Sequence, residues 1–236
     1  MLETKWLYII LNLFTISIPL FRSFESRVGF YKKLPSLFKS ILIVSSVFLI
    51  WDVYFTHRKI WGFTPQYVSG IDFFGLPLGE YLFFLTVPYA CIFIYECLKF
   101  FKPKGILSSK TTKAISLALM IFSFIMAFYG LFEGKWYTSS TFLFLGIAIS
   151  LVQFLAESNW LPRFYESYFI ALLPFFMKNG ILTGMLIDSQ VVWYNDEHNI
   201  GFRLGTIPFE DIFYGMLLIL GTLYFYENFE SKKEVR

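Results

Sequence analysis

The sequence is poor in the residues that most often bind metals or form covalent cross-links. Its 236 residues include two cysteines and two histidines, and charged residues make up only 16%. Cys91 and Cys97 are six positions apart, or about 9 Å along a helix, which is too far for a disulfide between them. Two thiols alone do not form a metal site, so no metal is expected.

Motifs of common cofactors are also missing. The sequence contains no G-x-G-x-x-G segment, which excludes a flavin or nicotinamide domain of the usual kind. It has no paired D-x-x-x-D motif that could offer magnesium to a diphosphate. Its last long apolar run has no lysine before Lys232, which argues against a retinal Schiff base. We therefore expect no cofactor. The net charge of +3 says little by itself. No nucleic-acid partner is expected.

Apolar residues are abundant instead. They make up 56% of the chain, the mean hydropathy is +0.59, and they come in runs of about twenty, the span of a bilayer core. The first run is followed by Arg22 and Glu25 rather than by the small residues of a cleavage site, so no cleaved signal is expected. We expect a multi-pass protein of the cell membrane.

The apolar runs predict an all-α polytopic membrane protein with about seven transmembrane helices. Pro88 and Pro174 fall inside two of these helices, where neighbouring helices can satisfy the carbonyl groups that a proline leaves free. The predicted spans are Lys5–Phe21, Phe38–Phe55, Glu80–Phe101, Lys113–Phe132, Thr138–Glu157, Phe164–Ile187 and Asp211–Phe229.

Positive charges are distributed unevenly between the two ends of these spans. Fourteen lysines and arginines fall at one end and five at the other, while Lys178 lies inside the sixth span. Because cytoplasmic loops are enriched in Lys and Arg, the richer end and the C-terminus are predicted to be cytoplasmic. The richer end has Arg22, Arg27, Lys32, Lys33, Lys39, Lys99, Lys102, Lys104, Lys110, Lys113, Arg163, Lys232, Lys233 and Arg236. The poorer end has Lys5, Arg58, Lys59, Lys135 and Arg203.

One short segment occurs twice, each time at the start of a long apolar run. Gly75–Glu80 precedes the third span and Thr206–Asp211 precedes the seventh, and each contains a proline followed closely by an acid. Trp61 and Trp193 also match, with one residue of slippage. At an offset of 131 positions, the matched residues are Gly70 with Gly201, Pro77 with Pro208, Tyr95 with Tyr226 and Glu96 with Glu227.

This repetition predicts a chain of two related halves. Residues 1–104 form the first repeat, 105–136 a linker helix and 137–236 the second repeat. A three-helix unit ends on the side of the membrane opposite its start, so the fourth helix is needed to return the chain and make the two copies parallel. One site built from both halves is expected.

Acidic residues near the outer ends of the spans are the main candidates for chemistry. They are Asp52, Glu80, Asp188, Glu210 and Asp211. In a first helical turn after proline, acids also stabilise the helix N-terminus, so a structural reading competes with a catalytic one. Both copies place such acids at the membrane boundary, where charge is costly, and this favours function for Glu80, Glu210 and Asp211. Asp52, about one turn inside the second span, is the fourth catalytic candidate.

Most of the other polar residues are expected to have no chemical role. Glu96 and Glu227 are expected at solvated helix ends, and His57 and His198 at polar loop positions without a chemical role. Lys178 would need either snorkelling or a carboxylate partner, and the sequence does not choose between them.

Two long aromatic-rich loops, Thr56–Gly79 and Asp188–Phe209, precede the repeated segments. Their aromatic residues suit an interfacial belt, whereas their length suits lids or binding loops. Both interpretations can hold together.

Taken together, these residues resemble the small integral-membrane lycopene cyclases, whose two homologous halves occur as separate subunits or as one fused chain. The resemblance covers nearly the whole chain. In the first half it rests on Trp51-Asp52, Thr56, Trp61-Gly62-Phe63, Tyr67, Gly70 and Leu76-Pro77-Leu78-x-Glu80-x-x-Phe83-Phe84. In the second half it rests on Gly180-Ile181-Leu182-Thr183-Gly184, Trp193-Tyr194-Asn195, Gly201-x-Arg203 and Ile207-Pro208-x-Glu210-Asp211.

The resemblance implies a redox-neutral isomerase of the lycopene β-cyclase type, which closes a ring at the end of an acyclic, lycopene-like carotenoid to give a product such as β-carotene. Such an enzyme needs a protonated acid, a base and a dry aromatic cavity that stabilises cations. Other carotenoid-pathway enzymes become candidate partners, besides the lipid bilayer. The implied substrate-binding residues are Trp51, Trp61, Phe63, Tyr67, Phe84, Trp193, Tyr194, Asn195, Arg203 and Tyr214.

One position departs from the family pattern, which has two acids after the proline and one intervening residue. The second copy keeps both as Glu210 and Asp211, whereas the first has Gly79 before Glu80. A lopsided site, with one half mainly catalytic, is one explanation, and a catalytically weakened partner subunit of a carotenoid enzyme is another. A parallel-repeat transporter or lipid-handling protein is the remaining alternative.

Overall fold

The computed structural model describes residues 3–154 and 158–234, and this part of the chain contains seven α-helices. The all-α prediction is confirmed, and the helices occur where the apolar runs lie. They are α1 (Leu7–Ser23), α2 (Leu34–His57), α3 (Leu78–Phe101), α4 (Ser109–Phe132), α5 (Trp136–Phe154), α6 (Leu161–Leu182) and α7 (Phe209–Glu234).

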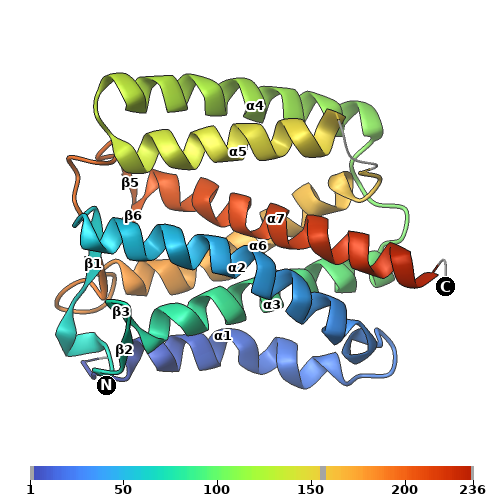
Figure 1. The fold of residues 1–236 in the computed structure, drawn as a ribbon. Helices are drawn as coiled ribbons and strands as arrows, with labels where there is room; N and C mark the ends of the chain where they lie inside the picture. Colours follow the sequence, from blue (N-terminus) through green and yellow to red (C-terminus); the bar gives the residue numbers. More distant parts are fainter. Residues whose placement is uncertain (1–2, 155–157, 235–236) are drawn as a thin grey trace.

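Five of these helices, α2, α3, α4, α5 and α7, are long and apolar enough to cross a bilayer. α1 is apolar but has only 17 residues, and α6 has 22 residues that include Arg163, Glu166 and Lys178. Both pack alongside α3, so they run through the same layer as the longer helices (Figure 1). The chain is a membrane protein.

The predicted end of the sixth span at Ile187 is wrong, because α6 stops at Leu182. The Thr183 hydroxyl donates to the Asn179 carbonyl (2.8 Å), and Gly184 then turns the backbone with a φ of +110°. Positive φ is compatible with glycine and ends a helix. The predicted fifth span ended at Glu157, which lies outside the described residues, as does Arg236.

The two halves of the chain repeat the same order of helices around a common centre. α3 and α7 lie at the middle of the bundle, α2 packs against α7, and α6 packs against α3, so each half contributes a helix to the other (Figure 1). α4 lies along one edge beside α5, outside both sets. The fold is two parallel three-helix repeats joined by a linker helix. The division at residues 104 and 136 remains a proposal.

Short strands gather at one end of the bundle and connect the repeats (Figure 1). β1 (Trp61–Phe63) of the first half pairs antiparallel with β4 (Val192–Tyr194) of the second. Each half also has a small hairpin, formed by β2 (Asp72–Phe73) with β3 (Leu76–Pro77) and by β5 (Arg203–Leu204) with β6 (Ile207–Pro208). The loops before the repeated segments are therefore ordered.

Each hairpin delivers an acid into the first turn of the next helix. In the first hairpin Phe74 and Gly75 both have positive φ, as a tight two-residue hairpin turn requires. The strand then ends at proline, and α3 or α7 begins at the following residue. The expectation that Glu80, Glu210 and Asp211 stand in first turns is confirmed.

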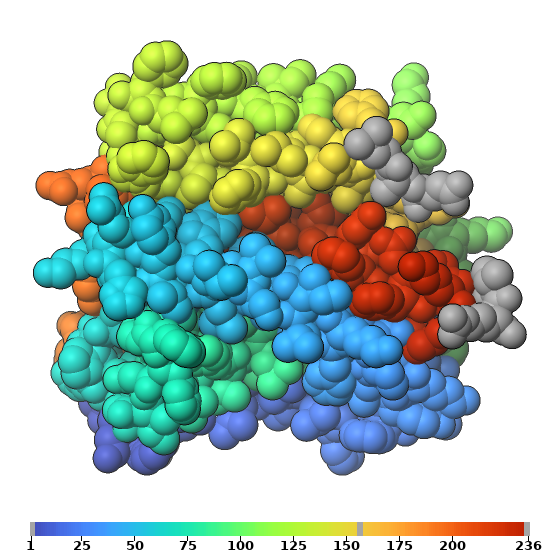
Figure 2. Space-filling model, in the orientation of Figure 1, coloured from blue at the N-terminus to red at the C-terminus, as the bar shows by residue number. Residues whose placement is uncertain are grey.

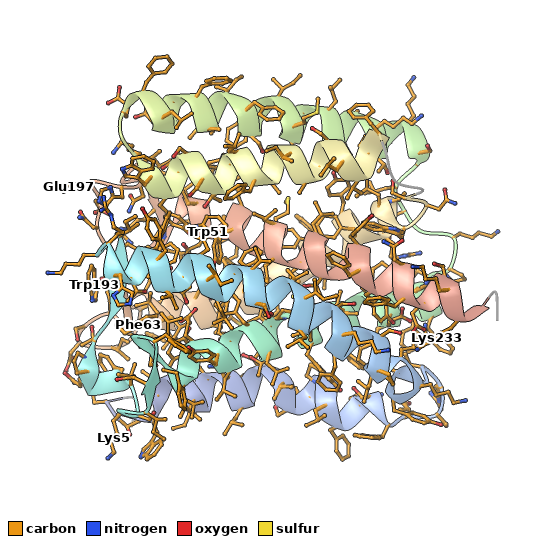
Figure 3. The ribbon with its side chains drawn as sticks, in the orientation of Figure 1. Lys5, Trp51, Phe63, Trp193, Glu197 and Lys233 are labelled. Carbon is orange, nitrogen blue, oxygen red and sulfur yellow. The ribbon has the colours of Figure 1, made fainter. Side chains whose placement is uncertain are left out.

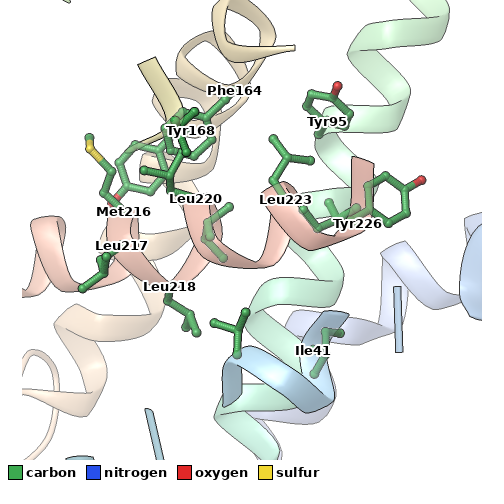
Figure 4. Close-up of a cluster of buried hydrophobic side chains, with 14 of the residues drawn as sticks. Ile41, Tyr95, Phe164, Tyr168, Met216, Leu217, Leu218, Leu220, Leu223 and Tyr226 are labelled. Atoms are coloured by element: carbon green, nitrogen blue, oxygen red, sulfur yellow. The ribbon is translucent and has the colours of Figure 1, made fainter. Parts of the chain in front are cut away.

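The hydrophobic core surrounds α7 away from the strands. Leu218, Leu220 and Leu223 of α7 are fully buried, next to side chains from α6 such as Phe164 and from α2 such as Ile41 (Figure 4). The packed helices leave their outer side chains on the surface (Figure 2). Large apolar side chains are exposed on every helix except α7, as expected for contact with lipid.

The end of the bundle opposite the strands contains two reciprocal tyrosine–glutamate hydrogen bonds. The Tyr95 hydroxyl of α3 donates to Glu227 of α7 (2.6 Å), and the Tyr226 hydroxyl of α7 donates to Glu96 of α3 (2.9 Å). Lys33 forms an ion pair with Glu96 (2.5 Å). The prediction that Glu96 is solvated is wrong, since only 3% of it is exposed.

Candidate active site

A small cavity of about 50 Å³ lies between the first turns of α3 and α7, next to the β1–β4 pair. It has room for only a few water molecules. Three of the four predicted catalytic acids, Asp52, Glu80 and Asp211, line it. Its other lining residues are Tyr8, Trp61, Phe63, Phe83, Tyr137, Phe175, Asn179, Leu182, Thr183, Val192, Tyr194, Tyr214 and Gly215.

Asp52 of α2 and Glu80 of α3 form a buried carboxyl pair in the wall of this cavity. Asp52 Oδ1 accepts a hydrogen bond from the Trp61 indole nitrogen (2.5 Å). Asp52 Oδ2 is buried without a hydrogen bond from the described residues, and both the Glu80 carboxyl and the Thr56 hydroxyl lie close to the Asp52 carboxyl. A protonated carboxyl can donate a hydrogen bond to an ionised one, whereas two ionised carboxylates have no hydrogen to share.

Asp211 of α7 corresponds to Glu80 at the repeat offset of 131 positions, but its environment is different. Its Oδ1 accepts from the Tyr137 hydroxyl (2.6 Å) and its Oδ2 from the Tyr194 hydroxyl (2.9 Å). Burial and the neighbouring Asp211 raise the pKa of Tyr194 well above its ordinary value, so this hydroxyl stays protonated and able to donate. With a donor on each oxygen, Asp211 is held as an acceptor.

Tyr8 and Tyr137 play matching parts in the two repeats. Tyr8 of α1 donates to Glu80 Oε2, just as Tyr137 of α5 donates to Asp211. Glu80 and Asp211 are 131 positions apart and the two tyrosines 129. Sequence reasoning missed both tyrosines. Their near-equal spacing was the signal that could have found them.

Glu210, the fourth predicted catalytic acid, is fully buried but does not line the cavity. It accepts from the Thr138 hydroxyl at the start of α5 (2.6 Å) and from the backbone nitrogen of Ile200 (2.9 Å). These bonds tie α5 and the second loop to α7. The geometry therefore favours a positioning role, and its catalytic role stays a prediction.

The glycine that replaces an acid in the first repeat has a packing reason. A Cβ built on Gly79 would lie 2.5 Å from the Tyr8 ring, closer than any real contact. The Gly79 carbonyl also accepts from Asn12 Nδ2 (2.9 Å). The position that corresponds to Glu210 has no room for a side chain, because Tyr8 occupies the space beside Glu80.

Four of the ten predicted substrate-binding residues line the cavity: Trp61, Phe63, Tyr194 and Tyr214. Their rings are close to one another, with centroid separations of 6.2 Å for Trp61–Tyr194 and 6.0 Å for Trp61–Tyr214. Tyr137 adds a further ring, 5.1 Å from Trp61. The cavity wall is thus largely aromatic.

Among the other six, three have structural partners at the strand end of the bundle. Trp193, at the strand end in Figure 3, packs over Gly62, and a Cβ added to Gly62 would lie 2.3 Å from the indole. Arg203 forms an ion pair with Asp196 (2.6 Å), and the Tyr67 hydroxyl donates to Glu3 (2.5 Å).

The remaining three also lie outside the cavity lining. Trp51 packs behind Tyr214 at a centroid distance of 5.1 Å, and Phe84 is fully buried against Phe48. Asn195 accepts from the backbone nitrogen of Glu197 in a loop turn (3.0 Å).

Lys178 is buried near the strand end of α6. Its Nζ donates to Asn12 Oδ1 (2.9 Å) and lies 4.6 Å from the centre of the Phe83 ring. It forms no ion pair within residues 3–154 and 158–234, although its charge acts on Glu80 from a greater distance. The Asn12 amide oxygen and the face of the Phe83 ring therefore surround the Lys178 amino group.

Within the described residues, no group of three or more His, Cys, Asp or Glu side chains is placed to hold a metal ion. No curated protein and no solved structure matches the chain. A family model described as lycopene cyclase matches residues 5–98 and 134–229, which are the two repeats without the linker helix α4. Because this match covers both halves of the site and most of the sequence, the chain belongs to the lycopene cyclase family, a family of enzymes.

Proposed function

We propose that the protein closes a ring at the end of an acyclic, lycopene-like carotenoid by acid-initiated cyclisation. One observation carries this proposal: the Asp52–Glu80 carboxyl pair and the Asp211 carboxylate line one cavity with aromatic walls. A proton donor, a proton acceptor and a cation-stabilising surface are the three components that this reaction needs.

The proposed reaction begins with the proton shared by Asp52 and Glu80. Transfer of this proton to the terminal double bond leaves a tertiary carbocation. An internal double bond attacks the cation and closes the six-membered ring. Asp211 then takes a proton from the ring carbon next to the new cation, and the electron pair of that C–H bond becomes the ring double bond. One proton enters and one leaves, so substrate and product are isomers.

The roles of the acids follow from their surroundings. Carboxyl groups within reach of each other hold a proton that neither would keep alone. Asp211 receives hydrogen bonds on both oxygens, which suits a carboxylate that accepts a proton. The product is proposed to have the β-type ring.

The small volume of the cavity supports protection of the cation from water. Pockets for small molecules typically measure roughly 300–1,000 Å³, so about 50 Å³ is too small for a carotenoid end without side-chain movement. We infer that the end group displaces the few waters that a cavity of this size can hold. Neighbouring Trp61, Tyr137 and Tyr214 then surround the cation with π faces.

Expression of the protein in cells that make lycopene tests this function. The proposal predicts a new carotenoid of unchanged mass with absorption at shorter wavelength, because the ring double bond twists out of the conjugated plane. The Asp211→Asn variant serves as the control and should accumulate lycopene. Unchanged lycopene with the wild-type protein, at normal membrane levels, would favour the transporter or partner-subunit alternatives.

A further inference from the structure

The two repeats differ at one pair of helix contacts beside the cavity. Between α2 and α3, Phe48 and Phe84 pack with their ring centroids 6.0 Å apart. At the offset of 131 that relates the repeats, the corresponding residues in α6 and α7 are Asn179 and Gly215. Neither Phe48 nor Phe84 lines the cavity, whereas both Asn179 and Gly215 do. Two aromatic rings therefore fill this position in the first repeat, whereas the cavity reaches the same position in the second repeat.

Gly215 of α7 faces two aromatic residues of α6, next to the point where the Tyr168 hydroxyl donates to the Ile212 carbonyl of α7. A Cβ at this position would lie 3.4 Å from the Tyr168 hydroxyl oxygen and 3.7 Å from Phe175 Cε2. A methyl group would therefore fit, but a larger side chain would have to displace Tyr168 or Phe175. The glycine leaves the cavity extending between the two helices.

This gap borders the lipid-facing surface of α6. Phe175 lines the cavity and is half-buried, while Leu173 and Met177 on either side of it are 71% and 62% exposed. Pro174 precedes Phe175 and cannot donate the helical hydrogen bond to Ile170. A proline inside a membrane helix allows local bending, which suits a side chain that must move aside.

We propose that the conjugated chain of the substrate enters from the lipid between α6 and α7, over Gly215, with Phe175 as the movable side chain. This inference rests on the proposed function, since it names the route of that substrate to the same cavity. The Phe48–Phe84 contact closes the equivalent route in the first repeat. The polyene therefore lies on the second-repeat side, and its end group reaches Asp211 and the Asp52–Glu80 pair.

Blocking the gap after folding gives a direct test. In a background with Cys91 and Cys97 replaced by Ala, the Phe175→Cys variant is purified in detergent and reacted with maleimides of increasing size. Cyclisation of lycopene should fall at least tenfold with the larger reagents. The matched control is Met177→Cys, two residues away on the exposed face, which should keep its activity after the same labelling. Equal activity of both labelled variants would overturn the proposed route.

Protection from labelling provides a second readout. Lycopene added first should slow maleimide labelling of the Phe175→Cys variant severalfold and leave Met177→Cys unchanged. Equal labelling rates with and without lycopene would contradict entry at this position. If lycopene protects Phe175→Cys from labelling but the wild-type protein forms no ring, the proposed function fails and the route stands. If the ring forms without protection, only the route fails.

A genetic version uses Gly215. The Gly215→Leu variant should lose at least tenfold in kcat/KM, and the added Phe175→Ala change should restore most of it by returning space. Membrane level and thermal unfolding of each variant separate blocked entry from misfolding. Gly215→Leu at wild-type kcat/KM, in a protein that folds normally, would exclude passage over this glycine.

Discussion

The adjacent acids Glu210 and Asp211 differ in what they touch. Asp211 faces the cavity and accepts from two tyrosine hydroxyls, whereas Glu210 points to Thr138 and the Ile200 backbone. The repeated proline–acid segment does not distinguish the two residues. Their neighbours in space do.

Substitution of these two acids should therefore have separable effects. Asp211→Asn is expected to lower turnover by roughly 10²–10⁴-fold, the usual contribution of a general acid or base, with normal folding. Glu210→Gln should instead lower the midpoint of thermal unfolding and keep turnover per folded molecule within about threefold. Turnover measured in detergent, normalised to folded protein, checks both. Equal loss of turnover in the two variants would assign catalysis to Glu210 as well.

Gly79 allows a test of the contact between Tyr8 and Glu80. The Gly79→Ala change places a methyl group 2.5 Å from the Tyr8 ring, so the ring must move away from Glu80. We expect a loss of about 1–3 kcal/mol in the free energy of unfolding, as for other overpacked sites, together with reduced turnover. Gly221→Ala in α7 is the matched control, because its Cβ would meet Val44 at 3.4 Å. A neutral result at Gly79 would refute the steric explanation for the missing acid.

At the scale of the helices and strands, the lengths of the apolar runs in the sequence predicted most of the fold. Runs of about twenty apolar residues identified all seven helices, and the proline–acid segments located the starts of α3 and α7 within two residues. The end of α6 was missed because the apolar pattern continues past Gly184, where the backbone turns. The β1–β4 pair was missed because three-residue strands from distant loops leave no periodic signal.

The site was predicted only in part, because some of its residues stand out in the sequence and others do not. Acids in apolar surroundings stand out in a sequence, and three of four proved to share a cavity. Tyr8 and Tyr137 do not stand out, since a tyrosine at the end of a membrane helix is normally an interfacial residue. Their hydroxyl contacts depend on how α1 packs on α3 and α5 on α7, which one sequence does not specify.

The ends of α3 and α7 away from the strands offer a prediction about coupling between the repeats. Glu96→Gln removes the ion pair with Lys33 and weakens the Tyr226 hydrogen bond in a buried place, so the free energy of unfolding should fall by about 1–3 kcal/mol. Glu227→Gln, whose partner Lys99 is half exposed, should cost less. Unfolding curves in detergent check both, and turnover should stay near normal. Lost turnover without lost stability would indicate a role beyond joining the repeats.

For the whole molecule, the uneven distribution of Lys and Arg suggests its orientation. Lys5 lies at the strand end and Lys233 at the opposite end (Figure 3), and the predicted spans assign fourteen of the twenty lysines and arginines to that opposite end. We propose that the opposite end is cytoplasmic and that the cavity lies near the outer face.

Reporter fusions test this orientation. Fusions after Ser108 and at the C-terminus are predicted to report a cytoplasmic location, and fusions within residues 64–75 an external one. The Ser108 and C-terminal fusions control each other, because an even number of crossings should separate them. A cytoplasmic signal from residues 64–75 would reverse the proposed topology and place the cavity at the inner face.

In the proposed mechanism, Asp52, Glu80 and Asp211 donate and accept the protons that isomerise a carotenoid end. Cyclisation of lycopene by the purified protein in deuterated water, followed by mass spectrometry, tests it most directly. One deuterium should appear in each new ring, at the carbon protonated first, and the same reaction in ordinary water should give a product of unchanged mass. A ring formed without solvent deuterium, or a product two mass units from lycopene in ordinary water, would contradict the acid–base mechanism.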